Sequence, residues 1–169
     1  QIQILKLIGI NKNKFIDTKK NQHCFSKKII FTSHPNYFKG TFSEAQSNIP
    51  KWIIRYLRKK FLKFVKKNKK NYKKIYIDRS DSIFNHCKLI NNNEIKTFLK
   101  SKGFNILKLS KLSFLKQISI FNNAKFIMGP HGAGFANLIF CKKNTKVIEL
   151  KPSNHPNSVY RRISGINKL

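Results

Sequence analysis

Residues 125–150, KFIMGPHGAGFANLIFCKKNTKVIEL, decide the fold, because they read as a strand, a glycine-rich turn, a short helix and a second strand in succession. The apolar run Phe126–Met128 is typical of a buried strand, and the glycines after it allow a tight turn. The helix expected at Phe135–Cys141 directs its free N–H groups toward this turn, where they favour a phosphate or diphosphate. His131, inside the turn, adds a further donor. A turn that serves packing alone is the alternative interpretation.

The same alternation of strands and helices extends over residues 71–150. We expect strands at 74–78, 104–109, 125–128 and 146–150, with two helices capped by Asn93 and Ser113 and a third at 135–141. Such alternation predicts an α/β fold, a Rossmann-like parallel sheet with helices on both faces. Ligands of these sheets bind at the carboxyl ends of the strands, where both the 78–80 corner and the glycine turn fall.

The N-terminal part is less regular. A helix is expected from Pro50 to about Val65, followed by a tract rich in Lys and Asn, so we place a domain boundary near residue 70. The prediction is a first unit at 1–70 and a second at 71–169. Residues 1–8 resemble the end of a helix, and we expect the chain to be a fragment that lacks its N-terminal portion.

The formal net charge of +30 indicates nucleic acid or an anionic membrane surface as a partner. The excess, however, consists of 31 Lys against 5 Arg and is dispersed along the chain. Lys, Asn, Ile and Phe are all abundant and all have codons rich in A and T, so base composition explains much of the charge. Lys59–Lys74 is the one dense basic run. We interpret it as a solvated helix face followed by a linker rather than as a binding site for a polyanion.

The three cysteines, Cys24, Cys87 and Cys141, are widely spaced and odd in number, which argues against a disulfide framework and a zinc site. No apolar run approaches the length that spans a bilayer, and no signal peptide is visible. We expect a cytoplasmic protein with peripheral contact to anionic membrane, or one in the secretory-pathway lumen if the source is eukaryotic.

Several segments together resemble glycosyltransferase family 61, which includes enzymes of the capsular polysaccharide type. The matching segments are YIDRSD (76–81), KLINNNEI (88–95), Gly103-Phe104 and LSFLKQISIFNNAKFIMGPHGAGFANLIFCKKNTKVIEL (112–150). The resemblance implies transfer of a sugar from a nucleotide donor in a GT-B-like arrangement of two Rossmann-like lobes. Residues 71–169 would then be the nucleotide-sugar-binding lobe, and residues 1–70 the end of the first, acceptor-side lobe.

The expected chemistry is stabilisation of the charge that grows on the departing diphosphate. Arg79 presents a planar donor fork at a strand end, and we expect Arg79 and His131 to be catalytic. The predicted diphosphate-binding set is Arg79, Lys88, Gly129, His131, Gly132, Ala133, Gly134 and Asn137. Alternatives stay open: an ion pair of Arg79 with Asp78 or Asp81, a solvated Lys88, and an Asn137 that only ties down the loop.

Glu149 is the one acid in the final strand, and the resemblance implies that it accepts hydrogen bonds from the ribose hydroxyls of the donor. The alternative is a carboxylate at the edge of the strand that faces water. Asp78 and Asp81 are spaced one residue too widely for the Asp-x-Asp pair that binds a divalent ion in other glycosyltransferases, so we expect no essential metal and no cofactor. The general base for an inverting transfer is left open between His131, His34 and Glu44.

The sequence therefore predicts a hexosyl- or pentosyltransferase that acts with a nucleotide sugar on a glycan or glycoconjugate acceptor. One alternative is a basic nucleic-acid-binding protein, although no RNP-like or zinc-finger signature is present and no specific nucleic acid is expected. The other is a non-catalytic nucleotide-binding module of Rossmann-like fold.

Overall fold

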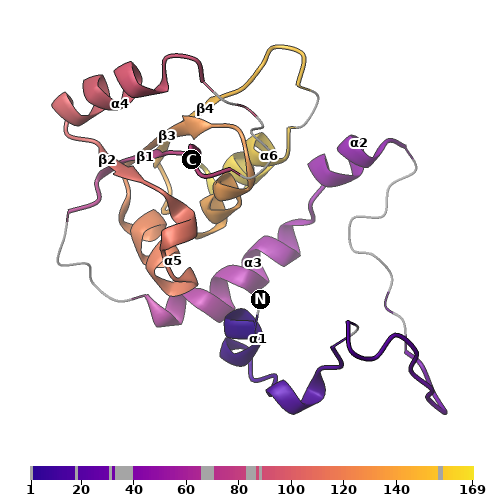
Figure 1. Cartoon of the computed structure of the whole chain (residues 1–169). Coiled ribbons are helices and arrows are strands. Elements are labelled where there is room, and N and C mark those ends of the chain that lie inside the picture. The colour runs from indigo at the N-terminus through magenta and orange to yellow at the C-terminus, as the bar shows by residue number, and fades with distance from the viewer. Residues whose placement is uncertain are drawn as a thin grey trace.

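The computed structural model describes residues 2–17, 19–30, 32, 40–65, 71–82, 87, 89–155 and 158–169. A parallel sheet lies among the helices of the C-terminal part of the chain (Figure 1). Within the described residues the sheet has four strands in the order β2-β1-β3-β4. The strands are β1 Lys74–Ile77, β2 Asn105–Leu107, β3 Phe126–Pro130 and β4 Lys146–Leu150. All neighbouring pairs are parallel, as the alternating pattern predicts.

The register of β3 decides which residues share a face. Ile127 pairs with Ile75 on one side and with Val147 on the other, and Gly129 pairs with Glu149. Partners in parallel strands point to the same face. Ile75, Ile127 and Val147 accordingly point into one hydrophobic core, and the row of Gly129 and Glu149 follows on that face.

Helices cover both faces of the sheet, as predicted. Helix α4, Asn92–Ser101, lies on the face of Tyr76, whose hydroxyl donates to Asn92. Helix α5, Phe114–Asn123, and the 3₁₀ helix η4, Ala133–Phe140, lie on the opposite face with Ile75 (Figure 1). Right-handed crossovers explain this, because the chain leaves β1 toward β2 and then returns past β1 to form β3. The arrangement is consistent with a Rossmann-like fold.

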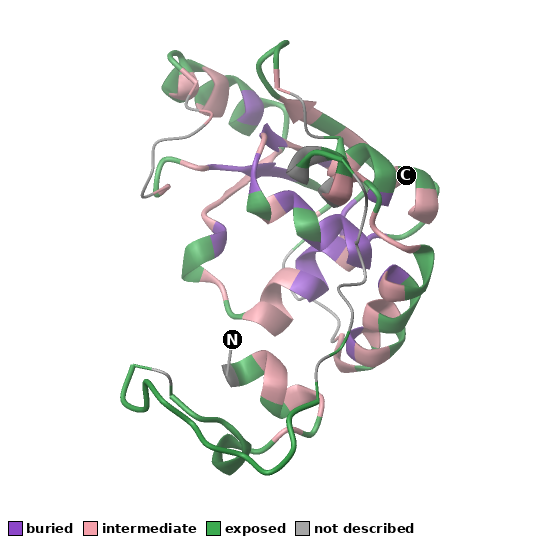
Figure 2. Ribbon diagram, turned by 90° about the vertical axis from the view of Figure 1, so that its right-hand side faces the viewer, coloured by how far each residue is buried: buried purple, intermediate pink, exposed green. Residues whose placement is uncertain are grey.

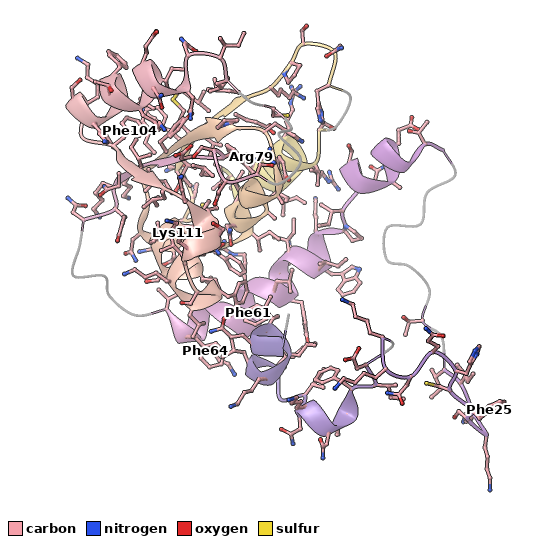
Figure 3. All side chains as sticks on the ribbon, in the orientation of Figure 1. Phe25, Phe61, Phe64, Arg79, Phe104 and Lys111 are labelled. Carbon is pink, nitrogen blue, oxygen red and sulfur yellow. The ribbon has the colours of Figure 1, made fainter. Side chains whose placement is uncertain are left out.

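The N-terminal elements contribute to the same core. They are α1 Ile2–Leu7, η1 Lys12–Lys14, α2 Phe42–Ser47, α3 Lys51–Phe61 and η2 Leu62–Phe64. Helix α3 buries Ile54 and also Phe61, which Figure 3 labels. The Phe61 ring lies 5.1 Å from that of Phe114 on α5. By contrast, the described residues between Phe15 and Ile30 contain neither helix nor strand and are exposed (Figure 2). The predicted division of the chain at residue 70 stays a prediction.

Three features differ from the expectation. Strand β3 continues through Gly129 and Pro130, so the turn begins at His131. The helix after the turn is a 3₁₀ helix that begins at Ala133, before the expected start at Phe135, and the carbonyls at its end and of Cys141 just after it accept hydrogen bonds from side chains of three other helices. These are Arg58 to Ile139 and Cys141, Asn122 to Phe140, and Asn167 to Leu138 and Ile139. Helix α6, Val159–Asn167, which packs on η4, was not predicted.

Gly129 generates the first prediction. An added Cβ at this position would lie 2.9 Å from both the Cβ and the carbonyl oxygen of Ile77. Because a backbone atom cannot give way cheaply, Gly129→Ala is expected to lower the free energy of unfolding by about 1–3 kcal/mol. Gly165→Ala, at an exposed position of helix α6 with nothing within 4 Å, is the matched control and is expected to raise it by about 0.4–1 kcal/mol. Urea unfolding measures both, and equal stability of the two variants would contradict the packing described.

Candidate functional site

The candidate site lies where β1 and β3 end side by side. The chain turns from β1 toward β2 and from β3 toward β4, so the connections leave these two neighbouring strands in opposite directions. Sheets of this type bind ligands outside the carboxyl ends of the strands at such a switch point. Arg79 follows β1, and His131 and Gly132 follow β3. The topology thus brings the two predicted catalytic residues together.

Arg79 reaches across from β1 to the turn after β3. Its Nη1 donates to the backbone carbonyl of His131, and its Nη2 lies 3.4 Å from the Ser82 hydroxyl. The guanidinium covers the Cα of Gly132, whose φ of 155° and lack of a Cβ leave room for it. A guanidinium carries five N–H donors, so donors remain for a ligand.

Neither neighbouring aspartate is the partner of Arg79 among the residues described. Asp78 is buried and accepts from the Ser80 amide and hydroxyl and from Asn92, and Lys96 lies 3.6 Å away. Burial works to raise the pKa of Asp78, but these hydrogen bonds and the lysine together hold it below its ordinary value. Asp81 instead accepts from the Ser110 hydroxyl. Asp78 therefore fixes the corner that Arg79 leaves.

His131 and Glu149 form a pair that the sequence alone did not predict. The His131 Nδ1 and the Glu149 Oε1 lie 2.5 Å apart, with 12% and 18% of the side chains exposed. The backbone causes this contact, because the His131 amide donates to the Leu150 carbonyl at 2.7 Å and extends the β3–β4 ladder by one residue. A carboxylate on Nδ1 fixes the orientation of the ring and leaves Nε2 as the other polar atom of the imidazole.

Two aromatic groups surround this pair. The ring of His155 lies 4.0 Å from that of His131, centroid to centroid, and the ring of Tyr160 lies 5.2 Å away. Loss of solvent and the electrostatic interactions with His131 and Lys151 lower the pKa of His155, and Glu149 opposes them. Burial and the charge of Glu149 raise the pKa of Tyr160. No pattern in the sequence around His155 indicated this contact.

The turn itself offers backbone donors. The Phe135 amide donates to the Gly132 carbonyl at 2.9 Å, so it is used within η4. The amides of Ala133 and Gly134 precede this first intrahelical bond, so they have no carbonyl partner within the helix. Asn137 donates to Gln117 at 3.0 Å and to the Gly134 carbonyl at 3.2 Å, contacts that order the turn. Gly129 packs within the sheet against Ile77.

The remaining predicted residues have different positions. Lys88 and His34 lie outside the described residues. Glu44 accepts from the Thr41 amide and hydroxyl in a capping box at the start of α2. These hydrogen bonds lower the pKa of Glu44, which makes it a weaker base. Glu149 also lines a cavity of about 380 Å³ between β4 and α6.

In the part of the chain that the structure describes, no group of three or more His, Cys, Asp or Glu side chains is arranged to hold a metal ion. The independence from metal stays a prediction. None of the described helices is both long and apolar enough to cross a bilayer.

The lowered pKa of Asp78 predicts a dependence of stability on pH. A carboxylate with a lowered folded-state pKa stabilises the fold above its unfolded pKa of about 4, and this contribution is lost as the pH falls through the folded value. Acid should therefore destabilise the wild-type protein more than Asp78→Asn, whereas exposed Asp17→Asn should follow the wild type. The chain has only 6 acids, so the difference is measurable by urea unfolding at pH 7 and pH 3. Parallel curves for all three proteins would contradict the role of Asp78.

No curated protein matches the chain. A family model described as Glycosyltransferase 61 matches residues 12–148, which include Arg79, His131 and the glycine turn. The match covers most of the chain and confirms the resemblance to this family. The chain belongs to the glycosyltransferase 61 family.

Proposed function

We propose that this protein transfers a hexosyl or pentosyl group from a nucleotide sugar to a glycan or glycoconjugate acceptor, without an essential metal. Membership of the family implies glycosyltransferase activity in general, with a nucleotide-sugar donor and a glycan acceptor. One observation carries the finer proposal: Arg79 and the His131–Glu149 pair flank the amides of the glycine turn at the switch point of the sheet. Residues 71–169 would act as the donor lobe of a GT-B-like enzyme.

In this proposal the diphosphate of the donor sits on the turn. The amides of Ala133 and Gly134 and the remaining N–H groups of Arg79 would bind its oxygens. Negative charge grows on these oxygens as the bond to the sugar breaks, so donors that are already fixed in place lower the barrier. The contact with the His131 carbonyl holds Arg79 in place before the ligand arrives.

We assign the general base to His131. With its Nδ1–H donated to Glu149, the neutral ring keeps a lone pair on Nε2 that can accept the proton of the acceptor hydroxyl. The cation that forms is stabilised by Glu149 and lies beside the turn, where its charge also favours the diphosphate. Glu44 is less suited because its carboxylate is held by Thr41. The ribose would bind in the cavity that Glu149 lines.

Turnover measurements test these roles. The protein is incubated with a panel of nucleotide sugars and glycan acceptors, and release of nucleoside diphosphate is followed. Arg79→Lys keeps the positive charge but loses the planar pair of guanidinium donors, so kcat is expected to fall by a factor of about 10²–10³. His131→Asn should lower kcat by about 10²–10⁴ and should abolish the increase in rate with pH that a base produces.

His23→Asn, a change at an exposed histidine, is the control and should leave turnover unchanged. Wild-type rates in Arg79→Lys and His131→Asn would contradict the proposed site. Binding of nucleotide sugars with no release from any of them would indicate a nucleotide-binding module without catalysis.

A further inference from the structure

A second, strongly basic cavity lies outside the glycine turn. It has a volume of about 640 Å³ and is bounded by the end of α2, the start of α3 and the length of α6. Five cationic side chains line it, and these are Lys51, Arg55, Arg161, Arg162 and Lys168. No acidic residue is among the described residues that line it. Ser158, at its edge, donates its amide to the Ser47 hydroxyl at 3.2 Å, which ties α6 to α2.

The use of arginine distinguishes this cavity from the general basic surface. The chain has 31 Lys and only 5 Arg, and three of the five arginines line this one cavity. The other two, Arg58 and Arg79, both donate to backbone carbonyls. The guanidinium groups in the cavity have no hydrogen-bond or ion-pair partner among the described residues. Unpaired cations that converge on a hollow repel one another, and an anion would relieve this repulsion.

The kind of anion follows from the side chains. Arginine donates two parallel hydrogen bonds to a phosphate or carboxylate, and several arginines together suit a phosphate with its larger charge. Ser47 and Ser158 also line the cavity and offer neutral polar groups beside the cations.

The cavity also adjoins the candidate site. Ser158 and Arg161 line both this cavity and the one beside Glu149. The residue before Arg161 is Tyr160, whose ring lies 5.2 Å from the ring of His131. A ligand in the basic cavity would therefore extend toward the proposed general base. The donor diphosphate is assigned to the glycine turn, which leaves this second anion site to the other substrate.

We propose that the basic cavity binds a phosphate group of the acceptor, so that the substrate is a phosphate-bearing glycan or glycoconjugate. That the ligand is an acceptor rests on the proposed function, whereas the phosphate site itself does not. The phosphate has two possible sources, a soluble phosphorylated glycan and the headgroup of a lipid-anchored one.

Binding of inorganic pyrophosphate tests the site directly. Calorimetry at fixed salt, with the glycine turn saturated by a nucleoside diphosphate, compares the wild type with the triple variant Arg55→Gln, Arg161→Gln and Arg162→Gln. The control triple variant, Lys73→Gln, Lys100→Gln and Lys125→Gln, removes the same charge at exposed positions outside the cavity. We expect the arginine variant to raise the pyrophosphate Kd about tenfold or more and the control less than about twofold. Equal changes in the two variants would overturn the proposal, because charge alone would then explain binding.

Two further measurements complete the test. The double variant Arg161→Lys and Arg162→Lys keeps the charge and should still weaken binding, which decides the matter if the triple variant fails to fold. Arg161 also lines the cavity assigned to the ribose, so the donor site is checked with Arg55→Gln and Arg162→Gln alone. This pair of changes should leave the nucleoside diphosphate Kd unchanged, whereas Arg79→Lys should raise it, so failure of the donor site is distinguishable from failure of this one. Wild-type pyrophosphate binding in the Arg161→Lys and Arg162→Lys variant would overturn the inference.

The source of the phosphate is assigned with vesicles. The protein is tested for binding to phosphatidylglycerol vesicles. A lipid phosphate is supported if the triple arginine variant no longer binds them while the lysine control still does. Unchanged retention together with weakened pyrophosphate binding supports a soluble acceptor. If the triple arginine variant still binds both vesicles and pyrophosphate as the wild type does, the proposed site is contradicted.

Discussion

The pairing of β3 with both of its neighbours sets the position of the candidate site. Because Gly129 packs against Ile77 on one side and pairs with Glu149 on the other, the turn that follows starts between the ends of β1 and β4. One further ladder bond, from His131 to Leu150, then brings the imidazole onto the carboxylate. A shift in this register would separate all of these groups, so the chemistry of the site depends on packing inside the sheet.

The few acids of this basic chain have defined partners at the site. Asp78 holds the corner after β1 through Ser80, Asn92 and Lys96, which leaves Arg79 free to bind the turn. Glu149 orients His131. A carboxylate that paired with Arg79 would compete with a diphosphate, and in the described residues none does. The local balance of charge, more than the total of +30, therefore determines what the site attracts.

The sequence predicted the α/β class, the parallel sheet and most strands, because buried apolar runs alternate with helix caps such as Ser113. It missed α6, although Val159, Ile163 and Ile166 are spaced as on one helix face. Preferences of single residues do not distinguish a 3₁₀ helix from an α-helix, so the sequence predicted a helix after the turn but not its type. The contact of His131 with Glu149 depends on strand register, and that of His155 on the path of residues 151–155, neither of which local pattern encodes.

The central claim is that the glycine turn binds the diphosphate of the donor. The most direct measurement is a titration of isotope-labelled protein with nucleoside diphosphates, followed by NMR at the backbone amides and the arginine side chains. The account predicts that the largest shifts occur at the amides of Ala133 and Gly134 and at the Arg79 guanidinium, and that they saturate at one equivalent. Shifts spread evenly over the exposed lysine-rich segments, with none at the turn, would contradict it.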